Sequence, residues 1–90
     1  IDVEGAEPLV VAGMTGLVQV ENPPPIVAEF NAPRSRVAGF PPEEFVRRLL
    51  RLQPRYRVYL VGLRRRGLVD PLRELSTRGG DANLLFTVGE

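Results

Sequence analysis

The sequence predicts an α/β fold built around a sheet of mainly parallel strands, in which the last strand runs antiparallel. Short apolar runs of strand length alternate with a segment of clear helical periodicity, and this alternation is typical of strands joined by helical crossovers. Glycines and prolines separate most of these segments. The chain has 90 residues, of which 43% are hydrophobic and 26% charged. These proportions are typical of one globular domain at most.

The first predicted element is the end of a buried strand at Ile1–Val3. Gly5 follows it and permits the sharp turn that a connection from strand to helix requires. A short helix is expected from the turn around Pro8, because proline suits a first helical turn, where no amide donor is needed. Gly13 or Gly16 would end this helix.

The next segment leads into a second strand. Leu17–Val20 is expected to form either a second short helical turn or an extended connection. Asn22–Pro25 cannot be helical, since successive prolines fix an extended backbone. Pro25–Phe30 is a nearly continuous apolar run, which predicts a parallel strand covered on both faces. Asn31–Phe40 is expected to be a loop.

The clearest helix is predicted over Pro42–Gln53. Glu43 and Glu44 stand four residues before Arg47 and Arg48, a spacing at which opposite charges stabilise a helix. Pairs of this kind contribute about 0.2–0.5 kcal/mol each. The apolar residues recur at helical spacing and predict the face that packs on the sheet: Phe45, Val46, Leu49, Leu50 and Leu52.

The last third of the chain predicts two more strands. Tyr56–Leu63 alternates imperfectly between apolar and polar residues and is expected to be a strand. Arg64–Gly67 is expected to be a turn, and Val69–Leu75 a short helix or an irregular segment interrupted by Pro71. Asn83–Val88 is the final apolar strand, which could form an antiparallel pair with the strand before it.

Composition excludes several classes of function. The 12 basic and 11 acidic residues nearly balance, so we expect neither nucleic acid nor a membrane surface as a partner. No apolar run approaches the roughly 20 residues that a spanning helix needs, and a cytoplasmic location is expected. Without Cys or His, the groups left to move protons are Asp, Glu and Tyr.

Three segments carry a family resemblance. Ile1–Gly13 reads Ile-Asp-Val-Glu-Gly-Ala-Glu-Pro-Leu-Val-Val-Ala-Gly and resembles the motif that follows the fourth strand of FkbM-type methyltransferases. Pro25–Asn31 and Asn83–Val88 resemble the fifth and final strands of that family, in the same order. The resemblance covers the whole chain. It implies that residues 1–90 are the C-terminal half of a Rossmann-like class I methyltransferase domain.

The resemblance also implies an activity. Members of the family transfer a methyl group from S-adenosylmethionine to a hydroxyl oxygen, often on a sugar or another small molecule. Most of the donor site belongs to the first half of such a domain, where a glycine-rich turn follows the first strand. This sequence has no such turn, and it opens on a strand at Ile1. We therefore expect a truncated O-methyltransferase that is inactive as an isolated piece.

The resemblance and the strand order together select four site residues. Ligands of open α/β sheets lie beyond the carboxyl ends of the strands. That rule selects Asp2 and Glu4 for the donor, Glu29 and Asn31 for the acceptor, and Asp2 with Glu29 as catalytic groups. Methyl displacement needs in-line placement of the acceptor oxygen and a group that takes its proton. No metal is expected, since a third oxygen ligand is missing.

Each assignment has a structural alternative. Asp2 could cap the following helix, and Glu4 could complement the helix dipole. Glu29 could form a structural salt bridge, and Asn31 could be a turn residue. Arg64–Arg66 could bind phosphate or nucleic acid, but a solvated turn is the simpler interpretation. For the whole chain, the alternative is a non-catalytic α/β interaction module that binds a partner protein through an exposed edge or helix face.

Overall fold

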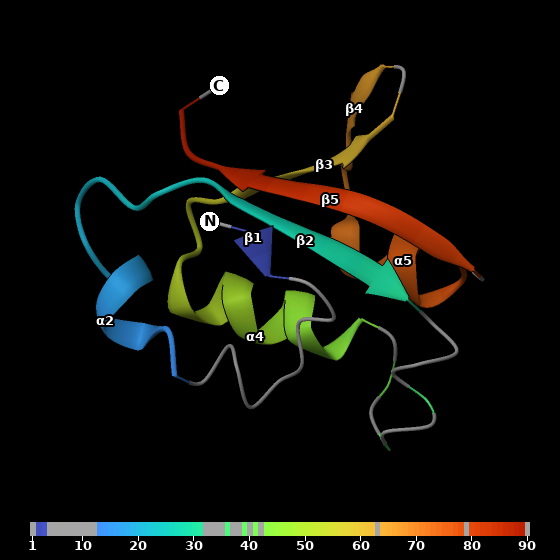
Figure 1. Ribbon diagram of the computed structural model, residues 1–90, viewed down its shortest axis with the longest axis horizontal. Coiled ribbons are helices and arrows are strands. Elements are labelled where there is room, and N and C mark those ends of the chain that lie inside the picture. Colours follow the sequence, from blue (N-terminus) through green and yellow to red (C-terminus); the bar gives the residue numbers. More distant parts are fainter. Residues whose placement is uncertain are drawn as a thin grey trace.

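The computed structural model of the chain is shown in Figure 1. It describes residues 2–3, 13–31, 43–62, 64–78 and 80–89, together with 36, 39 and 41. The elements in chain order are β1 (Asp2–Val3), α2 (Thr15–Val18), β2 (Ile26–Asn31), α4 (Glu44–Leu52), β3 (Arg57–Val61), β4 (Arg65–Gly67), α5 (Pro71–Ser76) and β5 (Asp81–Thr87).

The strands form one five-stranded sheet in the order β1-β2-β5-β3-β4. β1 runs parallel to β2, with Asp2 opposite Val27 in the register. β5 lies between β2 and β3 and is antiparallel to both, and β4 folds back on β3 as an antiparallel partner. Figure 1 shows β5 crossing the middle of the sheet above α4.

The predicted Rossmann-like sheet of mainly parallel strands is wrong. Within the described residues, the four longer strands β2, β5, β3 and β4 pair with one another only in antiparallel fashion, and the one parallel pair is that of the two-residue β1 with β2. The reason is the position of β5. It enters between β2 and β3, the two strands that the crossover through α4 would otherwise have set side by side. The antiparallel direction predicted for the last strand is confirmed.

Burial along β2 explains part of this error. Ile26, Ala28 and Phe30 are buried, whereas Val27 is 41% exposed and Glu29 is half-buried. Such alternation is typical of a strand covered on one face only, as in antiparallel sheets. The apolar run of β2 therefore predicted a strand correctly, but the prediction that both of its faces are covered is wrong.

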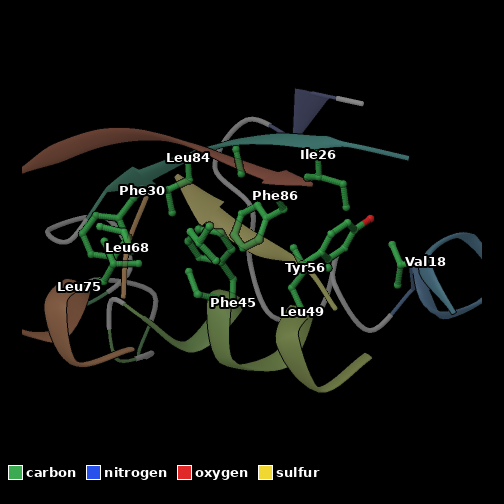
Figure 2. Packing of buried hydrophobic residues seen from close by; sticks show 13 residues of the cluster. Val18, Ile26, Phe30, Phe45, Leu49, Tyr56, Leu68, Leu75, Leu84 and Phe86 are labelled. Atoms are coloured by element: carbon green, nitrogen blue, oxygen red, sulfur yellow. The ribbon is translucent and has the colours of Figure 1, made fainter. Parts of the chain in front are cut away.

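The core lies between the sheet and the helices (Figure 2). Phe86 of β5 lies at its centre, with its ring centroid 6.3 Å from that of Phe45 on α4 and 6.1 Å from that of Tyr56. Phe45 also contacts Phe30 at 6.5 Å. The buried apolar residues are Val18, Ile26, Ala28, Phe30, Phe45, Val46, Leu49, Tyr56, Val58, Leu68, Leu75, Leu84 and Phe86. The apolar face predicted for the long helix is thus confirmed at Phe45, Val46 and Leu49.

Two side chains join the segment around α2 to the end of α4. The Gln53 side-chain amide is buried and donates from Nε2 to the carbonyl oxygen of Val18 at 2.9 Å. The Tyr56 hydroxyl donates to the carbonyl oxygen of Pro24 at 2.5 Å. Burial raises the pKa of Tyr56, so this hydroxyl stays protonated as a donor. The carbonyl groups of Val18 and Pro24 accept no hydrogen bond within a helix or strand, so these two side chains provide the donors that they need.

Other local predictions have mixed outcomes. The helical alternative for Leu17–Val20 is confirmed in part, because α2 includes Leu17 and Val18 but ends there. The helical alternative for Val69–Leu75 is confirmed by α5. Pro71 begins α5 rather than interrupting it, and Asp70 caps the helix by accepting from the Arg73 amide at 3.4 Å. The turn predicted at Arg64–Gly67 is wrong, because β4 occupies most of it. The helix predicted after Gly5 lies outside the described residues.

Glu44 makes two close ion pairs within α4. Its carboxylate lies 2.8 Å from Arg47 and 2.9 Å from Arg48, and the pairing proposed for Glu43 with Arg47 is longer, at 3.7 Å. The hydrogen bond from Arg48 and then that from Arg47 lower the pKa of Glu44 from its ordinary value of 4.5.

We expect Glu44→Gln to lower the free energy of unfolding by about 0.5–1 kcal/mol at neutral pH, since solvent screens these pairs. A carboxyl group with a lowered folded-state pKa stabilises the fold above its unfolded pKa, and this stabilisation is lost as the pH falls through the lowered value. Urea titrations at neutral pH and near pH 2 would measure the difference. Glu43→Gln is the control, with a smaller expected loss. An equal deficit for Glu44→Gln at both pH values would contradict the prediction.

Candidate functional site

A polar cavity of about 670 Å³ opens at the edge of the sheet where β2 and β3 end and β5 begins. Its volume is in the range of small-molecule sites, about 300–1,000 Å³. The lining residues are Glu29, Leu60, Val61, Gly62, Arg64, Arg66, Arg78, Asp81, Ala82 and Asn83. This is the carboxyl edge at which the sequence predicted ligand-binding residues.

The strands contribute carboxylates and amides to the cavity. Glu29 is half-buried and lies opposite Asn83 in the register of β2 and β5. Asn31 donates from Nδ2 to Oδ1 of Asp81 at 2.9 Å. Asp81 lines the cavity, so Asn31 is connected to the cavity by this hydrogen bond and does not line it directly. These groups can accept hydrogen bonds from hydroxyls, and the amides can also donate them.

Three arginines come from the segments that follow β3 and α5. Arg64 and Arg66 belong to the β3–β4 hairpin, and Arg78 follows α5. Arg66 lies 3.4 Å from Oε1 of Glu74, whose other oxygen accepts from the Asp70 amide at 3.0 Å. The Asp70 amide and then Arg66 lower the pKa of Glu74. Glu74 therefore remains ionised at neutral pH and holds Arg66.

The structure brings together two of the four predicted site residues. Glu29 lines the cavity, and Asn31 contacts the lining residue Asp81. The backbone of Asp2 lies in β1, the parallel neighbour of β2, at the level of Val27. Glu4 and the side chain of Asp2 lie outside the described part of the chain.

The sequence predicted the arginines poorly. Arg64–Arg66 were considered as a phosphate or nucleic-acid contact, but a solvated turn was preferred, and Arg78 was given no role. The sequence did contain one indication that these arginines lie near the cavity, namely the antiparallel pairing that it predicts for the last two long strands. That pairing, which the structure confirms, places the end of β3 and the start of β5 at the same edge. The connections that carry Arg64 and Arg78 therefore meet there.

A second cavity, of about 650 Å³, lies between the end of α4, β3 and the segment that leads into α5. Its lining is mainly apolar: Leu50, Pro54, Tyr56, Arg57, Val58, Tyr59, Gly67, Leu68, Val69 and Pro71. The described residues of this lining include no carboxylate, so they offer less for proton transfer than those of the polar cavity do.

No protein-family model, curated protein or solved structure matches this chain. The resemblance to FkbM-type methyltransferases therefore stays a prediction. Within the described residues, no group of three or more His, Cys, Asp or Glu side chains is placed to hold a metal ion. The helices described are all too short or too polar to cross a bilayer.

Proposed function

We propose that this chain is part of an S-adenosylmethionine-dependent O-methyltransferase that acts on a hydroxyl of a small-molecule or glycosyl acceptor. The observation that carries the proposal is Glu29, a half-buried carboxylate in a polar cavity at the carboxyl ends of β2 and β3. The proposal depends on this site and on the sequence resemblance rather than on the fold, since the same chemistry can recur on unrelated folds. We further propose a cytoplasmic location.

The described residues fit the acceptor side of such a site. S-adenosylmethionine would supply an electrophilic methyl group to the acceptor oxygen. Glu29 takes the proton of the attacking hydroxyl, and Asn83 and Asn31 help to orient the acceptor. On the donor side, Asp2 on β1 and Glu4 after it would hold the cofactor. The proposal is supported by the pairing of β1 with β2, in which Asp2 lies opposite Val27, two residues before Glu29 on the neighbouring strand.

The first test is donor binding. We expect the full-length protein, including any segment encoded upstream of Ile1, to bind S-adenosylmethionine in calorimetry, and the 90-residue chain alone not to bind it. Asp2→Asn should weaken binding about tenfold, the effect of losing one charge-assisted hydrogen bond. Glu21→Gln, at an exposed site, is the matched control. A full-length protein that binds no S-adenosylmethionine would overturn the proposal.

The second test separates Glu29 from the donor site. Glu29→Gln should leave donor affinity unchanged while it lowers methyl transfer to monosaccharides by about a hundredfold, the usual contribution of a general base. Transfer of a labelled methyl group measures the rate. Unchanged transfer would exclude Glu29 as the proton acceptor.

A non-catalytic interaction module is the alternative, and one observation favours it. On the face of the sheet away from α4, Val27 and Val61 are 41% and 39% exposed, and Val69 near α5 is 97% exposed. Exposed apolar side chains of this kind are common at protein interfaces when they gather in patches. Partner binding without any binding of S-adenosylmethionine would favour this alternative.

A further inference from the structure

We propose that the polar cavity binds a hydroxylated ligand through its phosphate or carboxylate group, with Arg64 and Arg78 as the anion-binding residues. The inference deepens the proposed function, on which it rests for the role of the ligand as methyl acceptor. It identifies the acceptor class as sugar phosphates or sugar acids.

The first argument is the placement of charge. The carboxylates of Glu29 and Asp81 come from the strands, whereas Arg64 and Arg78 come from the connections beyond them. Positive and negative groups thus enter the cavity from different parts of the chain. A ligand with an anionic group at one end and hydroxyls at the other matches both sets.

The second argument is the availability of the guanidinium groups. Arg66 is occupied by Glu74 at 3.4 Å. The side chains of Arg64 and Arg78 make no hydrogen bond or ion pair within the part of the chain that the structure describes, and both residues are exposed. Guanidinium groups bind phosphate and carboxylate by two parallel hydrogen bonds. Because both residues line the same cavity, their guanidinium groups are available to an anionic group of a ligand bound there.

The lining favours a small molecule over nucleic acid. Among the described residues, the lining of the cavity includes two carboxylates and no aromatic side chain on which a base could stack. The whole chain carries a formal net charge of only +1. The phosphate backbone of a nucleic acid would gain little binding energy from this nearly neutral surface. A single phosphate or carboxylate group needs only the two arginines.

Calorimetry of the full-length protein with three probes tests the proposal: glucose 6-phosphate, glucuronate and glucose. We expect the two anionic sugars to bind about tenfold more tightly than glucose, and inorganic phosphate to compete with them. The tighter of the two anionic probes identifies the anionic group. Equal binding of all three probes would overturn the proposal.

Arg64→Gln and Arg78→Gln should each weaken binding of the tighter anionic probe by about tenfold and leave the affinity for glucose unchanged. Arg51→Gln is the matched control, since Arg51 is exposed on the last turn of α4 and does not line the cavity. Wild-type binding by both cavity variants would also overturn the proposal.

A wild-type protein measured in rising NaCl gives a readout that needs no variant. Binding of the anionic probes should weaken with salt and binding of glucose should not. Donor binding keeps the two hypotheses separate. Loss of anion binding with S-adenosylmethionine still bound would defeat only this inference. The reverse result would defeat the methyltransferase proposal, and with it the role of the ligand as methyl acceptor, but not the anion site itself.

Discussion

Replacement of Phe86 by alanine is expected to lower the free energy of unfolding by about 3–5 kcal/mol. Phe86 is fully buried on β5, with the rings of Phe45 and Tyr56 about it at 6.3 and 6.1 Å. Phe45 belongs to α4, and Tyr56 directly precedes β3. The cavity left by the missing ring could therefore close only if both α4 and β3 moved. Because small domains are stable by only about 5–15 kcal/mol, this single change should come close to unfolding the chain.

Guanidinium titration followed by far-ultraviolet circular dichroism would measure the loss. Leu85→Ala is the matched control, since Leu85 is the neighbour of Phe86 on β5 and is half-buried on the opposite face. The expected loss for Leu85→Ala is below about 2 kcal/mol, because folding buries less apolar area of Leu85 than of Phe86. Equal losses at the two positions would contradict a core confined to one face of the sheet.

Replacement of Gln53 by leucine is expected to lower the free energy of unfolding by about 1–3 kcal/mol, the cost of a buried polar group left without a partner. Gln53 is 5% exposed and is the one buried polar residue in the described part of the chain. Its Nε2 donates to Val18 at 2.9 Å, and its Oε1 accepts from the Arg55 amide at 3.2 Å. Leucine fills similar space but satisfies neither partner.

The control for Gln53→Leu is the same change at Gln19, an exposed residue that ends α2. It should alter stability by less than about 0.5 kcal/mol. Hydrogen exchange provides a local readout, because the amides of α2 should exchange faster in Gln53→Leu while those of β5 change only with global stability. Unchanged exchange at Val18 would mean that Gln53 does not hold α2.

The sequence predicted elements better than it predicted their neighbours. The helical spacing of Phe45, Val46 and Leu49 predicted α4, because burial on one face imposes that period on any amphipathic helix. No periodic pattern in the sequence shows which strands lie next to each other in a sheet. The position of β5 between β2 and β3 could therefore not be predicted. β4 was missed because its residues, Arg65–Gly67, include no apolar side chain, and pairing with β3 alone makes them a strand.

The candidate site was predicted in part for similar reasons. Glu29 interrupts an apolar strand, and an ionisable group there is conspicuous in the sequence because burial of a charge is costly. Arg64 and Arg78 lie in polar connections, where charge is ordinary and gives no signal by itself. Their importance arises only from the antiparallel pairing of β3 with β5, which brings two distant connections to one cavity.

The central place of β5 affects how the protein is made. A ribosome releases the residues of β2 and β3 long before those of β5, and until then each strand lacks the partner that pairs with most of its length. The nascent chain must therefore hold two open strand edges in solution, a state that is prone to aggregate. A premature stop codon before Asp81 would leave it in that state permanently.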